Sequence, residues 1–359
     1  MIMKRIIPAI AVAAISAALM LSASKASAEE LWTLDIKSIN ADGTSEQMMY
    51  KPLAASEVSK KWNLCIIFPH VKDPYYIAFT YGAISEAKRL GAKLTVLAAK
   101  GYGDLTGQIS LVEDCVAQGA DGVSLTAVST EGLNKIISET VKKGVPVIDL
   151  GIGVTAPDVT GSIAASYYGA GESLGKYMAG KHPKGSGMTK MLYLAGPAGS
   201  GWVEDAARGL QDALKGSDLE ISKVVYGDSG KTVQMKLIED SLQAYPDVSY
   251  IAGIAPAAEG AVQILREQGM TDKVQVASFY TTPGVYQGVK GGSILAMTTD
   301  YNLTQARMAI DTLVRVLENK NPVLHIEPGF ETIDGAMVGA WKPATTLAPA
   351  DWKLVFKVD

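Results

Sequence analysis

Tyrosine is the side chain most prominent where a ligand would bind. The chain has 15 tyrosines against five tryptophans and five phenylalanines, so most of its aromatic rings carry a hydroxyl. Five of them follow an expected strand or open an expected helix: Tyr75, Tyr76, Tyr102, Tyr167 and Tyr280. In open α/β sheets the loops at the carboxyl ends of strands form the ligand crevice, and ring faces attract small organic cations. Any one of these tyrosines is equally well explained as a core or surface residue, so the prediction of an aromatic cage, with Asp73 at its rim, rests on the cluster.

Motifs for catalysis are missing from the sequence. It contains no His-Glu-x-x-His, Cys-x-x-Cys or Gly-x-Ser-x-Gly pattern, each of which would indicate a particular chemistry. Residues 227–232 end like a phosphate-binding loop, but Val225 occupies the position of its first glycine, so we interpret this segment as a turn. His70 has no acid or nucleophile beside it in sequence, which favours a polar wall residue. With three histidines and two cysteines in all, we expect no enzyme, no metal site and no cofactor.

The alternation of strands and helices predicts the fold. Between residues 63 and 150, β-branched runs alternate with helical stretches, and three of these helices end in a glycine just before a strand: Gly91, Gly119 and Gly144. Glycine there accepts the left-handed conformation that ends a helix, and repeated βα units predict a parallel sheet. The pattern restarts after 151–161 and continues to 280. We therefore predict an α/β protein with two Rossmann-like lobes in tandem and a cleft between them.

Composition agrees with a protein of this kind. A length of 359 residues suggests about two domains, and 48% apolar with 19% charged residues exclude a disordered chain. The formal charge of −4 provides no basic footprint, so we expect no nucleic-acid partner.

The first 28 residues have the features of a secretory signal peptide. Lys4 and Arg5 precede an uncharged apolar run, and 26–28 is the small-residue triplet that precedes cleavage. We predict cleavage after Ala28 and a periplasmic mature protein. The alternative is an uncleaved membrane anchor, since the apolar run approaches a spanning length. Residues 29–62 contain polar turns and lack the βα rhythm, which predicts a hairpin or arm before the first strand.

Both cysteines fall in the expected first lobe. Cys65 lies in the first expected strand and Cys115 in a helical stretch, 105–117. If that helix crosses over the strand, the two sulfurs meet, and an oxidising compartment favours a disulfide. The alternative is a pair of buried, reduced thiols.

Several motifs resemble those of the type I periplasmic binding proteins. They are residues 63–69, 72–76, 81–82, 100–102, 195–197, 253–259 and 278–280, together with Cys115. Within that family the chain is most similar to the sensors that bind trimethylamine N-oxide and present it to a membrane sensor histidine kinase. The resemblance runs from the N-terminal arm to about Leu317 and implies the family's fold, in which the two Rossmann-like lobes are joined by a multi-strand hinge.

The resemblance also implies a ligand, the residues that hold it and a signalling partner. It places the ligand-binding residues at Asp73, Tyr75, Tyr76, Tyr102, Tyr167 and Tyr280. Where the sensors of this group carry tryptophan, this chain has Tyr76 and Tyr167. A tyrosine ring attracts a cation less strongly than a tryptophan ring does, but its hydroxyl can donate or accept a hydrogen bond. The implied ligand is trimethylamine N-oxide or a related small methylated amine. The implied partner is the periplasmic domain of a membrane sensor kinase. We expect the lobes to close on the ligand, and the closed form to carry the signal to that partner.

A second class within the family is an alternative. It is the substrate-binding protein of an ABC transporter, which delivers a small polar solute such as a sugar to a membrane permease. Sugar-binding members usually end their last second-lobe strand in an aspartate, and we expect Tyr280 at that position, which argues against a sugar.

The family's crossovers imply a division of the chain. Its parts are a signal peptide (1–28), an arm (29–62), a first lobe (63–164 plus 281–299), a second lobe (165–280 plus 300–320) and a tail (321–359) on the surface. The chain is expected to cross between the lobes near 164–165, 280–282 and 299–301.

Overall fold

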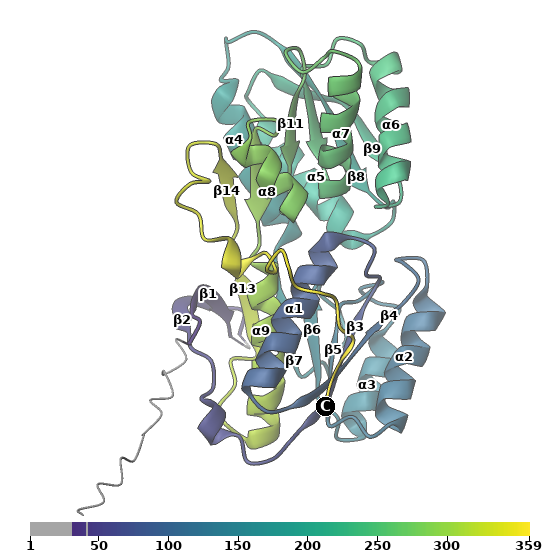
Figure 1. Cartoon of the computed structure of the whole chain (residues 1–359), viewed down its shortest axis with the longest axis vertical. Helices are drawn as coiled ribbons and strands as arrows, with labels where there is room; N and C mark the ends of the chain where they lie inside the picture. Colours follow the sequence, from purple (N-terminus) through teal and green to yellow (C-terminus); the bar gives the residue numbers. More distant parts are fainter. Residues whose placement is uncertain (1–30, 41) are drawn as a thin grey trace, which may run out of the picture. The chain divides into compact units, whose positions relative to one another are not determined.

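Two α/β lobes, each a sheet flanked by helices, make up the described part of the protein (Figure 1). The computed structural model describes residues 31–40 and 42–359, so the predicted signal peptide and its cleavage site lie outside the described residues. Within these ranges no helix combines the length and apolar character needed to cross a membrane.

The first lobe is built on a nine-stranded sheet. In spatial order its strands are β15 (Lys357–Val358), β4 (Lys93–Ala98), β3 (Asn63–Phe68), β5 (Gly122–Leu125), β6 (Val147–Gly151), β7 (Gly161–Ala164), β13 (His325–Pro328), β1 (Leu34–Ile39) and β2 (Ser45–Tyr50). The strands from β4 to β13 run parallel, whereas β15, β1 and β2 pair antiparallel with their neighbours. The helices of this lobe are α1 (Pro74–Arg89), α2 (Leu105–Ala117), α3 (Asn134–Lys142) and α9 (Asn302–Glu318). This confirms the parallel sheet predicted from the βα rhythm.

The second lobe is built on a six-stranded sheet. In spatial order its strands are β14 (Glu331–Asp334), β12 (Ala296–Thr299), β11 (Gln275–Ser278), β10 (Tyr250–Gly253), β8 (Thr189–Gly196) and β9 (Leu219–Tyr226). Its helices are α4 (Tyr167–Lys181), α5 (Gly201–Leu214), α6 (Lys231–Ala244), α7 (Ala255–Glu267) and α8 (Pro283–Lys290). All neighbours are parallel except β14, which pairs antiparallel with β12. The second half of the sequence therefore repeats the architecture of the first.

Three helices end at the predicted glycines, and α1 begins at a side-chain cap that the structure reveals. Gly91, Gly119 and Gly144 have φ of +69°, +77° and +84°, the left-handed region that only glycine enters without strain. At the other end, Asp73 caps α1 by accepting a hydrogen bond from the Tyr75 amide (2.9 Å). Pro74, at the first position of the helix, needs no N–H partner there. These signals fix where each loop at the sheet edge begins.

The N-terminal arm forms the predicted hairpin, and it extends the first-lobe sheet. β1 and β2 pair with each other, and β1 also pairs with β13. The segment after this hairpin is anchored to α9: the Tyr50 hydroxyl (2.6 Å) and the Leu53 amide (2.7 Å) both donate to the carboxylate of Asp311. A short 3₁₀ helix, η1 (Ala55–Glu57), leads from there to β3.

The assignment of two segments near the hinge is corrected by the structure. β12 pairs with β11 in the second-lobe sheet, so 281–299 belongs to the second lobe. α9 packs against α1, β5 and β6, so 300–320 belongs to the first lobe. A side chain at Gly82 of α1 would collide with the Leu303 carbonyl of α9, which shows how closely these two helices approach. Each of the two segments therefore belongs to the lobe opposite to the one expected. The reason is that β12 is only four residues long, and its sequence pattern is too weak to be recognised as a strand.

The crossings between the lobes change accordingly. Those expected near 164–165 and 299–301 are confirmed, since β7 is followed by α4 and β12 by α9. The crossing expected at 280–282 is wrong, because β11, α8 and β12 all lie in the second lobe. A further crossing instead joins β13 of the first sheet to β14 of the second.

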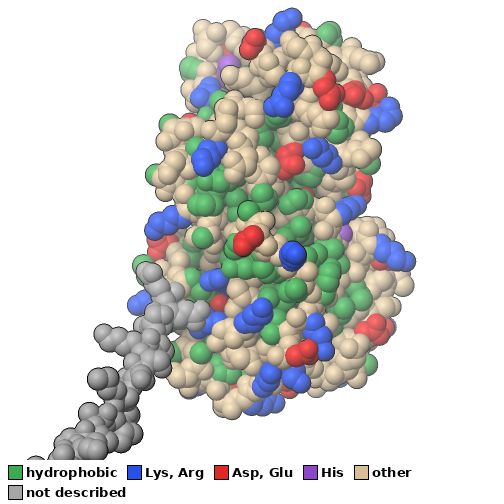
Figure 2. Space-filling model, viewed as in Figure 1, with side chains coloured by type: hydrophobic (Ala, Val, Ile, Leu, Met, Phe, Trp, Pro, Cys, Tyr) green, Lys and Arg blue, Asp and Glu red, His purple; other side chains and the backbone are tan. Residues whose placement is uncertain are grey.

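The C-terminal tail is more than a surface wrap. After β13 and β14 have each joined a sheet, η2 (Pro343–Thr345) packs on α9 and β15 pairs with β4 at the edge of the first-lobe sheet. Apolar side chains gather near the middle of the face in Figure 2. A groove of about 640 Å³ lies among α1, α8 and the tail, lined by residues that include Pro74, Ile77, Pro283, Tyr286, Leu347 and Trp352.

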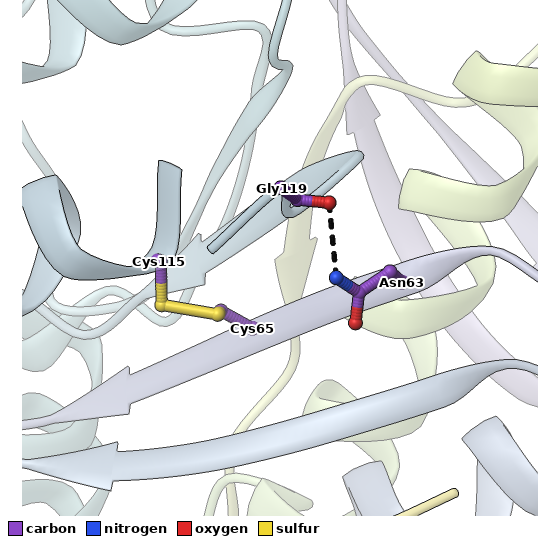
Figure 3. Close-up of a disulfide and its surroundings, with 4 residues drawn as sticks. All are labelled: Asn63, Cys65, Cys115 and Gly119. Atoms are coloured by element: carbon purple, nitrogen blue, oxygen red, sulfur yellow. Dashed lines mark hydrogen bonds between the residues drawn. A yellow bond between two sulfur atoms is a disulfide. The ribbon is translucent and has the colours of Figure 1, made fainter. Parts of the chain in front are cut away.

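Cys65 of β3 and Cys115 of α2 form a disulfide (Figure 3). Both are buried, at 6% and 1% exposure, in the core between the sheet and the helices α2 and α3. The Asn63 side chain donates to the Gly119 carbonyl (2.9 Å), which adds a second link from β3 to the loop after α2. The prediction that this helix crosses the first strand is confirmed, and the alternative of reduced thiols does not apply.

Candidate functional site

A small cavity of about 30 Å³ lies between the two lobes. Its lining consists of His70, Asp73, Tyr75, Tyr76, Tyr102, Tyr167, Trp202, Ser229 and Tyr280. The structure therefore brings together all six residues that the sequence predicts as a ligand cage. The six come from loops and helix starts that follow β3, β4, β7 and β11, and Trp202 and Ser229 come from those that follow β8 and β9. All of these are carboxyl ends of parallel strands, as expected.

Asp73 links the two lobes at the cavity. One of its carboxylate oxygens caps α1, and the other accepts a hydrogen bond from the Tyr280 hydroxyl of the second lobe (2.5 Å). Asp73 is 4% exposed, and burial raises the pKa of its carboxyl to about 6, although the hydrogen bonds from Tyr280 and from the Tyr75 amide act in the opposite direction. The Asp73 carboxylate is thus buried, and the Tyr75 amide and the Tyr280 hydroxyl that donate to it are both uncharged.

A second buried carboxylate lies behind the cage. The Tyr75 hydroxyl donates to Asp300 (2.5 Å), which follows β12 at a crossing between the lobes. Burial raises the pKa of Asp300 to about 6, and the Tyr75 hydrogen bond opposes this. Its other carboxylate oxygen is buried without a hydrogen-bond partner among the described residues. Two acids therefore back the tyrosine rings, each fixed by a tyrosine hydroxyl.

The first-lobe wall is a compact group of rings. The hydroxyls of Tyr76 and Tyr102 are 2.6 Å apart and share a hydrogen bond. The His70 ring packs edge-on against both, with centroid distances of 4.9 and 5.5 Å. Burial lowers the pKa of His70 to about 4, and the nearby Lys72 charge acts in the same direction, so this imidazole is neutral at pH 7. This agrees with the predicted role of His70 as a polar wall residue.

The second lobe supplies the facing wall. The Trp202 ring lies 5.7 Å from the Tyr102 ring and 5.8 Å from the Tyr167 ring. Ser229 approaches His70 from the loop after β9, with 3.4 Å between its hydroxyl oxygen and Nε2 of the imidazole. Ring contacts across the cleft mean that the cavity exists only when the lobes are together.

An ion pair joins the lobes at the outside of the cleft. Lys72 of the first lobe contacts both carboxylate oxygens of Asp228 of the second lobe at 2.8 Å. Both side chains are about half-exposed, so the pair is worth at most about 1 kcal/mol. Next to it, a groove of about 420 Å³ contacts Tyr102 from the other side, which makes Tyr102 a wall shared by the groove and the cavity.

Three participants were not among the residues predicted for the cage. Trp202 opens α5 and Asp300 follows β12, so both sit at strand ends like the predicted residues, and this position is the signal that identifies them. Ser229 lies in the segment 227–232, which the sequence correctly predicts to be a turn before a helix. Nothing in its type or spacing distinguishes it from other loop serines.

The arrangement is suited to binding rather than to turnover. The lining presents ring faces and one carboxylate, that of Asp73, and none of its members is lysine, arginine or cysteine. No group of histidine, cysteine, aspartate and glutamate side chains suited to a metal ion occurs in the described ranges. Ring faces and buried acids together favour a small organic cation.

The chain has relatives among proteins of known type. The family model described as "Periplasmic binding protein domain" matches residues 64–321. Periplasmic protein TorT of Escherichia coli O157:H7 is 29% identical over 280 residues, covering 77% of this chain and 78% of TorT. The ribose import binding protein RbsB of Salmonella typhimurium is 25% identical over 237 residues, covering 66% of this chain and 78% of RbsB.

Solved structures of periplasmic binding proteins are also similar to this chain. An ABC transporter solute binding protein from Bradyrhizobium sp. BTAi1, with bound Bis-Tris, is 45% identical, with a TM-score of 0.79, and the match covers 90% of this chain and 98% of that one. TorT in its complex with the TorS sensor domain, in the presence of TMAO, is 27% identical with a TM-score of 0.77, covering 82% of this chain and 100% of that one. Such proteins are periplasmic and bind solutes without transforming them. The chain belongs to the periplasmic binding protein family.

Proposed function

We propose that this protein binds a small methylated amine or amine N-oxide, such as trimethylamine N-oxide, in the cavity between its lobes. The observation that carries the proposal is the pairing of ring faces with two buried carboxylates, Asp73 in the lining of the cavity and Asp300 behind it, while the lining contains no lysine or arginine. The predicted cage residues are the proposed ligand-binding residues.

The electrostatics of the cavity support a cationic or dipolar ligand. Burial disfavours the ionised form of both carboxyls and raises their pKa values to about 6. A methylated nitrogen against the tyrosine faces would offset that cost, because its positive charge is spread over methyl groups that fit an apolar wall. Each ring face contributes about 0.5–2 kcal/mol to such contacts.

The relatives support a ligand with a substituted nitrogen. Bis-Tris, bound in the structure that is 45% identical, is a tertiary amine that carries hydroxyl groups. TMAO, present with the TorT complex, is a trimethylated amine oxide. Both combine a substituted nitrogen with oxygen, although the two proteins differ in their named roles.

A sugar is the less favoured ligand. Four of the five tyrosine hydroxyls in the lining, those of Tyr75, Tyr76, Tyr102 and Tyr280, are engaged with carboxylates or with one another. Few polar groups are left for sugar hydroxyls. Tyr280 itself gives no reason to exclude a sugar, because β12, and not β11, is the last parallel strand of the second-lobe sheet, and an aspartate, Asp300, comes directly after it.

Closure of the lobes would carry the message of binding. The ligand contacts both walls only in the closed form, so it shifts the population toward that form. In the sensor role, the closed surface and the arm 29–62 would contact the periplasmic domain of a membrane sensor kinase, as TorT is complexed with the TorS sensor domain. Export through the signal peptide, cleaved after Ala28, would place the protein in the periplasm.

Delivery to an ABC transporter permease is the second candidate. The relative at 45% identity is an ABC transporter solute binding protein, whereas TorT is 27–29% identical. Co-purification of the closed protein with a sensor kinase domain supports the sensor role. Ligand uptake that is lost on deletion of the gene supports transport.

Isothermal titration of the mature protein, residues 29–359, tests the proposed ligand class. Trimethylamine N-oxide, trimethylamine, betaine, choline and ribose are titrated in turn. Saturable binding of one of the methylated compounds, with no binding of ribose, is the expected result. Binding of ribose alone would overturn the proposal and leave the fold intact. Small-angle scattering with and without the ligand that binds then tests closure, which requires the two profiles to differ.

A further inference from the structure

Trp202 carries a polar group that has no partner in the closed cavity. The side chain is 7% exposed and forms part of the cavity lining. Its indole nitrogen is buried and makes no hydrogen bond to any described residue. An indole N–H donates and cannot accept, so leaving it buried and unpaired costs free energy that only an acceptor restores.

The fold holds this ring in place. Trp202 is the second residue of α5, and its ring packs against Phe279 of the second-lobe core at a centroid distance of 6.0 Å. Gly196, at φ +113°, leaves room for the far end of the ring: a side-chain carbon there would lie 3.0 Å from the Trp202 Cη2 atom. The Tyr167 ring, which belongs to the same lobe, lies at a centroid distance of 5.8 Å. Trp202 is thus fixed before any ligand arrives.

The other hydroxyl protons in the cavity are largely committed. Tyr75 donates to Asp300 and Tyr280 donates to Asp73. Tyr76 and Tyr102 share one hydrogen bond between them, so one proton of that pair stays available. The second unpaired nitrogen, Nδ1 of His70, donates or accepts depending on its tautomer. Trp202 is therefore the one lining side chain whose unpaired group can act only as a donor.

We infer that Trp202 is a specificity-determining residue, which donates its N–H to an oxygen of the ligand. The inference rests on the proposed ligand class and deepens it. The carboxylates and ring faces hold the methylated nitrogen, and the indole N–H selects compounds in which that nitrogen also carries or adjoins an oxygen acceptor. A methylated ammonium without oxygen leaves the indole unpaired and binds more weakly for that reason.

A pair of ligands of equal shape isolates this contact. Trimethylamine N-oxide and tetramethylammonium are both tetrahedral and differ by oxygen in place of one methyl group. Dissociation constants for both are measured with the wild-type protein and with Trp202→Phe, which keeps a ring and removes the N–H. We expect the preference for the N-oxide over tetramethylammonium to fall about tenfold in the variant, as befits one unpaired donor. Trp341→Phe is the matched control, because the Trp341 indole is also unpaired but lies outside the cavity, against Tyr286.

A measurement on the wild-type protein guards against a variant that fails to fold. With ¹⁵N-labelled protein, the indole N–H resonance that Trp202→Phe removes, or that is otherwise assigned to Trp202, is followed during titration. It should move downfield with the N-oxide and much less with tetramethylammonium. If both ligands bind, an unchanged preference in the variant or equal shifts for both ligands overturns the role of Trp202 alone. If neither ligand binds the wild-type protein, the proposed ligand class falls, and this inference falls with it.

Discussion

The two lobes share an architecture but differ in how firmly they are held. The first lobe has a nine-stranded sheet, a disulfide in its core and the hairpin arm anchored on Asp311. The second lobe has a six-stranded sheet and neither cysteine of the chain. The first lobe also supplies five of the cavity residues, and their mutual contacts lie within that lobe: His70, Asp73, Tyr75, Tyr76 and Tyr102.

This difference indicates a division of labour between the lobes. The Tyr76–Tyr102 hydrogen bond and the Asp73 helix cap form without the second lobe, so half of the site is preorganised. The second lobe brings Trp202, Ser229 and Tyr280, each of which meets the first lobe across the cleft. Changes in the first lobe should therefore alter affinity and stability directly, and changes at the interlobe contacts should alter closure.

The largest expected effect comes from removing the disulfide. The double substitution Cys65→Ser, Cys115→Ser opens a loop whose ends are 50 residues apart, and the unfolded chain regains entropy worth about 4 kcal/mol. Hydrogen exchange should show faster opening of β3, β5 and α2 with little change in β8 and β10. Equal losses in the two lobes would mean that they unfold as one unit and that the contrast in stability does not exist.

Asp73→Ala should weaken ligand binding about thirtyfold, because a charged hydrogen-bonding group is lost from the cavity. It should also lower the free energy of unfolding by about 1 kcal/mol through loss of the α1 cap. Asp104→Ala is the matched control: Asp104 caps α2 by accepting from the Gly107 amide (3.1 Å) and lies outside the cavity. It should cost similar stability and leave titration calorimetry unchanged. Equal affinity losses in both variants would show that Asp73 acts only as a cap.

The pH dependence of binding and of stability should have opposite signs. Burial raises the pKa values of Asp73, Asp149 and Asp300 to about 6, so the folded state binds their protons more readily than the unfolded state. Their contribution to the free energy of unfolding is full below about pH 4 and is lost as the pH rises through 6. A cationic ligand needs Asp73 and Asp300, the two carboxyls bonded to cage tyrosines, to be ionised. Its affinity should therefore be about tenfold lower at pH 5 than at pH 7.

Tetramethylammonium is the ligand for that comparison, because its charge does not titrate and only the protein's groups respond. Asp73→Asn should flatten the profile if enough affinity remains to measure it. An affinity that stays constant between pH 5 and pH 7 would contradict the role of the carboxylates in holding a cation.

The smallest effect is expected at the ion pair between the lobes. Lys72→Ala should reduce affinity two- to fivefold at low salt and less at high salt, because an exposed pair contributes about 0.2–1 kcal/mol and is screened. Lys190→Ala breaks a similarly exposed pair with Asp247 inside the second lobe and should leave affinity unchanged. If both variants bind normally, the pair does not favour the closed form.

Much of this arrangement can be predicted from the sequence because its signals are local. Helix-ending glycines, the Asp73–Pro74 helix start and β-branched runs each act within a few residues, and they predict both lobes and the loops that carry the cage. The hinge cannot be predicted in this way. β12 is four residues long, and whether it pairs with β11 or with a first-lobe strand depends on contacts far away in sequence. The left-handed Tyr301, at φ +58°, and the place of α9 on the first lobe depend on the same distant packing.

The site shows the same limit. The tyrosines share a type and a position, so the sequence alone predicts them as a group. Trp202 and Asp300 also lie at strand ends, but they are not tyrosines. Only the folded chain shows that Asp300 accepts a hydrogen bond from Tyr75. Partners across the cleft are set by closure, which no pattern along the chain records.

The path of the C-terminal tail has a mechanical consequence. The chain leaves the first sheet at β13, joins the second at β14 and returns to the first at η2 and β15, in addition to its crossings after β7 and β12. Several parallel tethers leave two bodies fewer independent directions of movement than a single linker does, and they favour rotation about one axis over sliding or twisting. Along one such coordinate, the angle at which the lobes stop is set by the bulk between them. The size of the bound solute would then determine the distance between the outer surfaces of the two lobes.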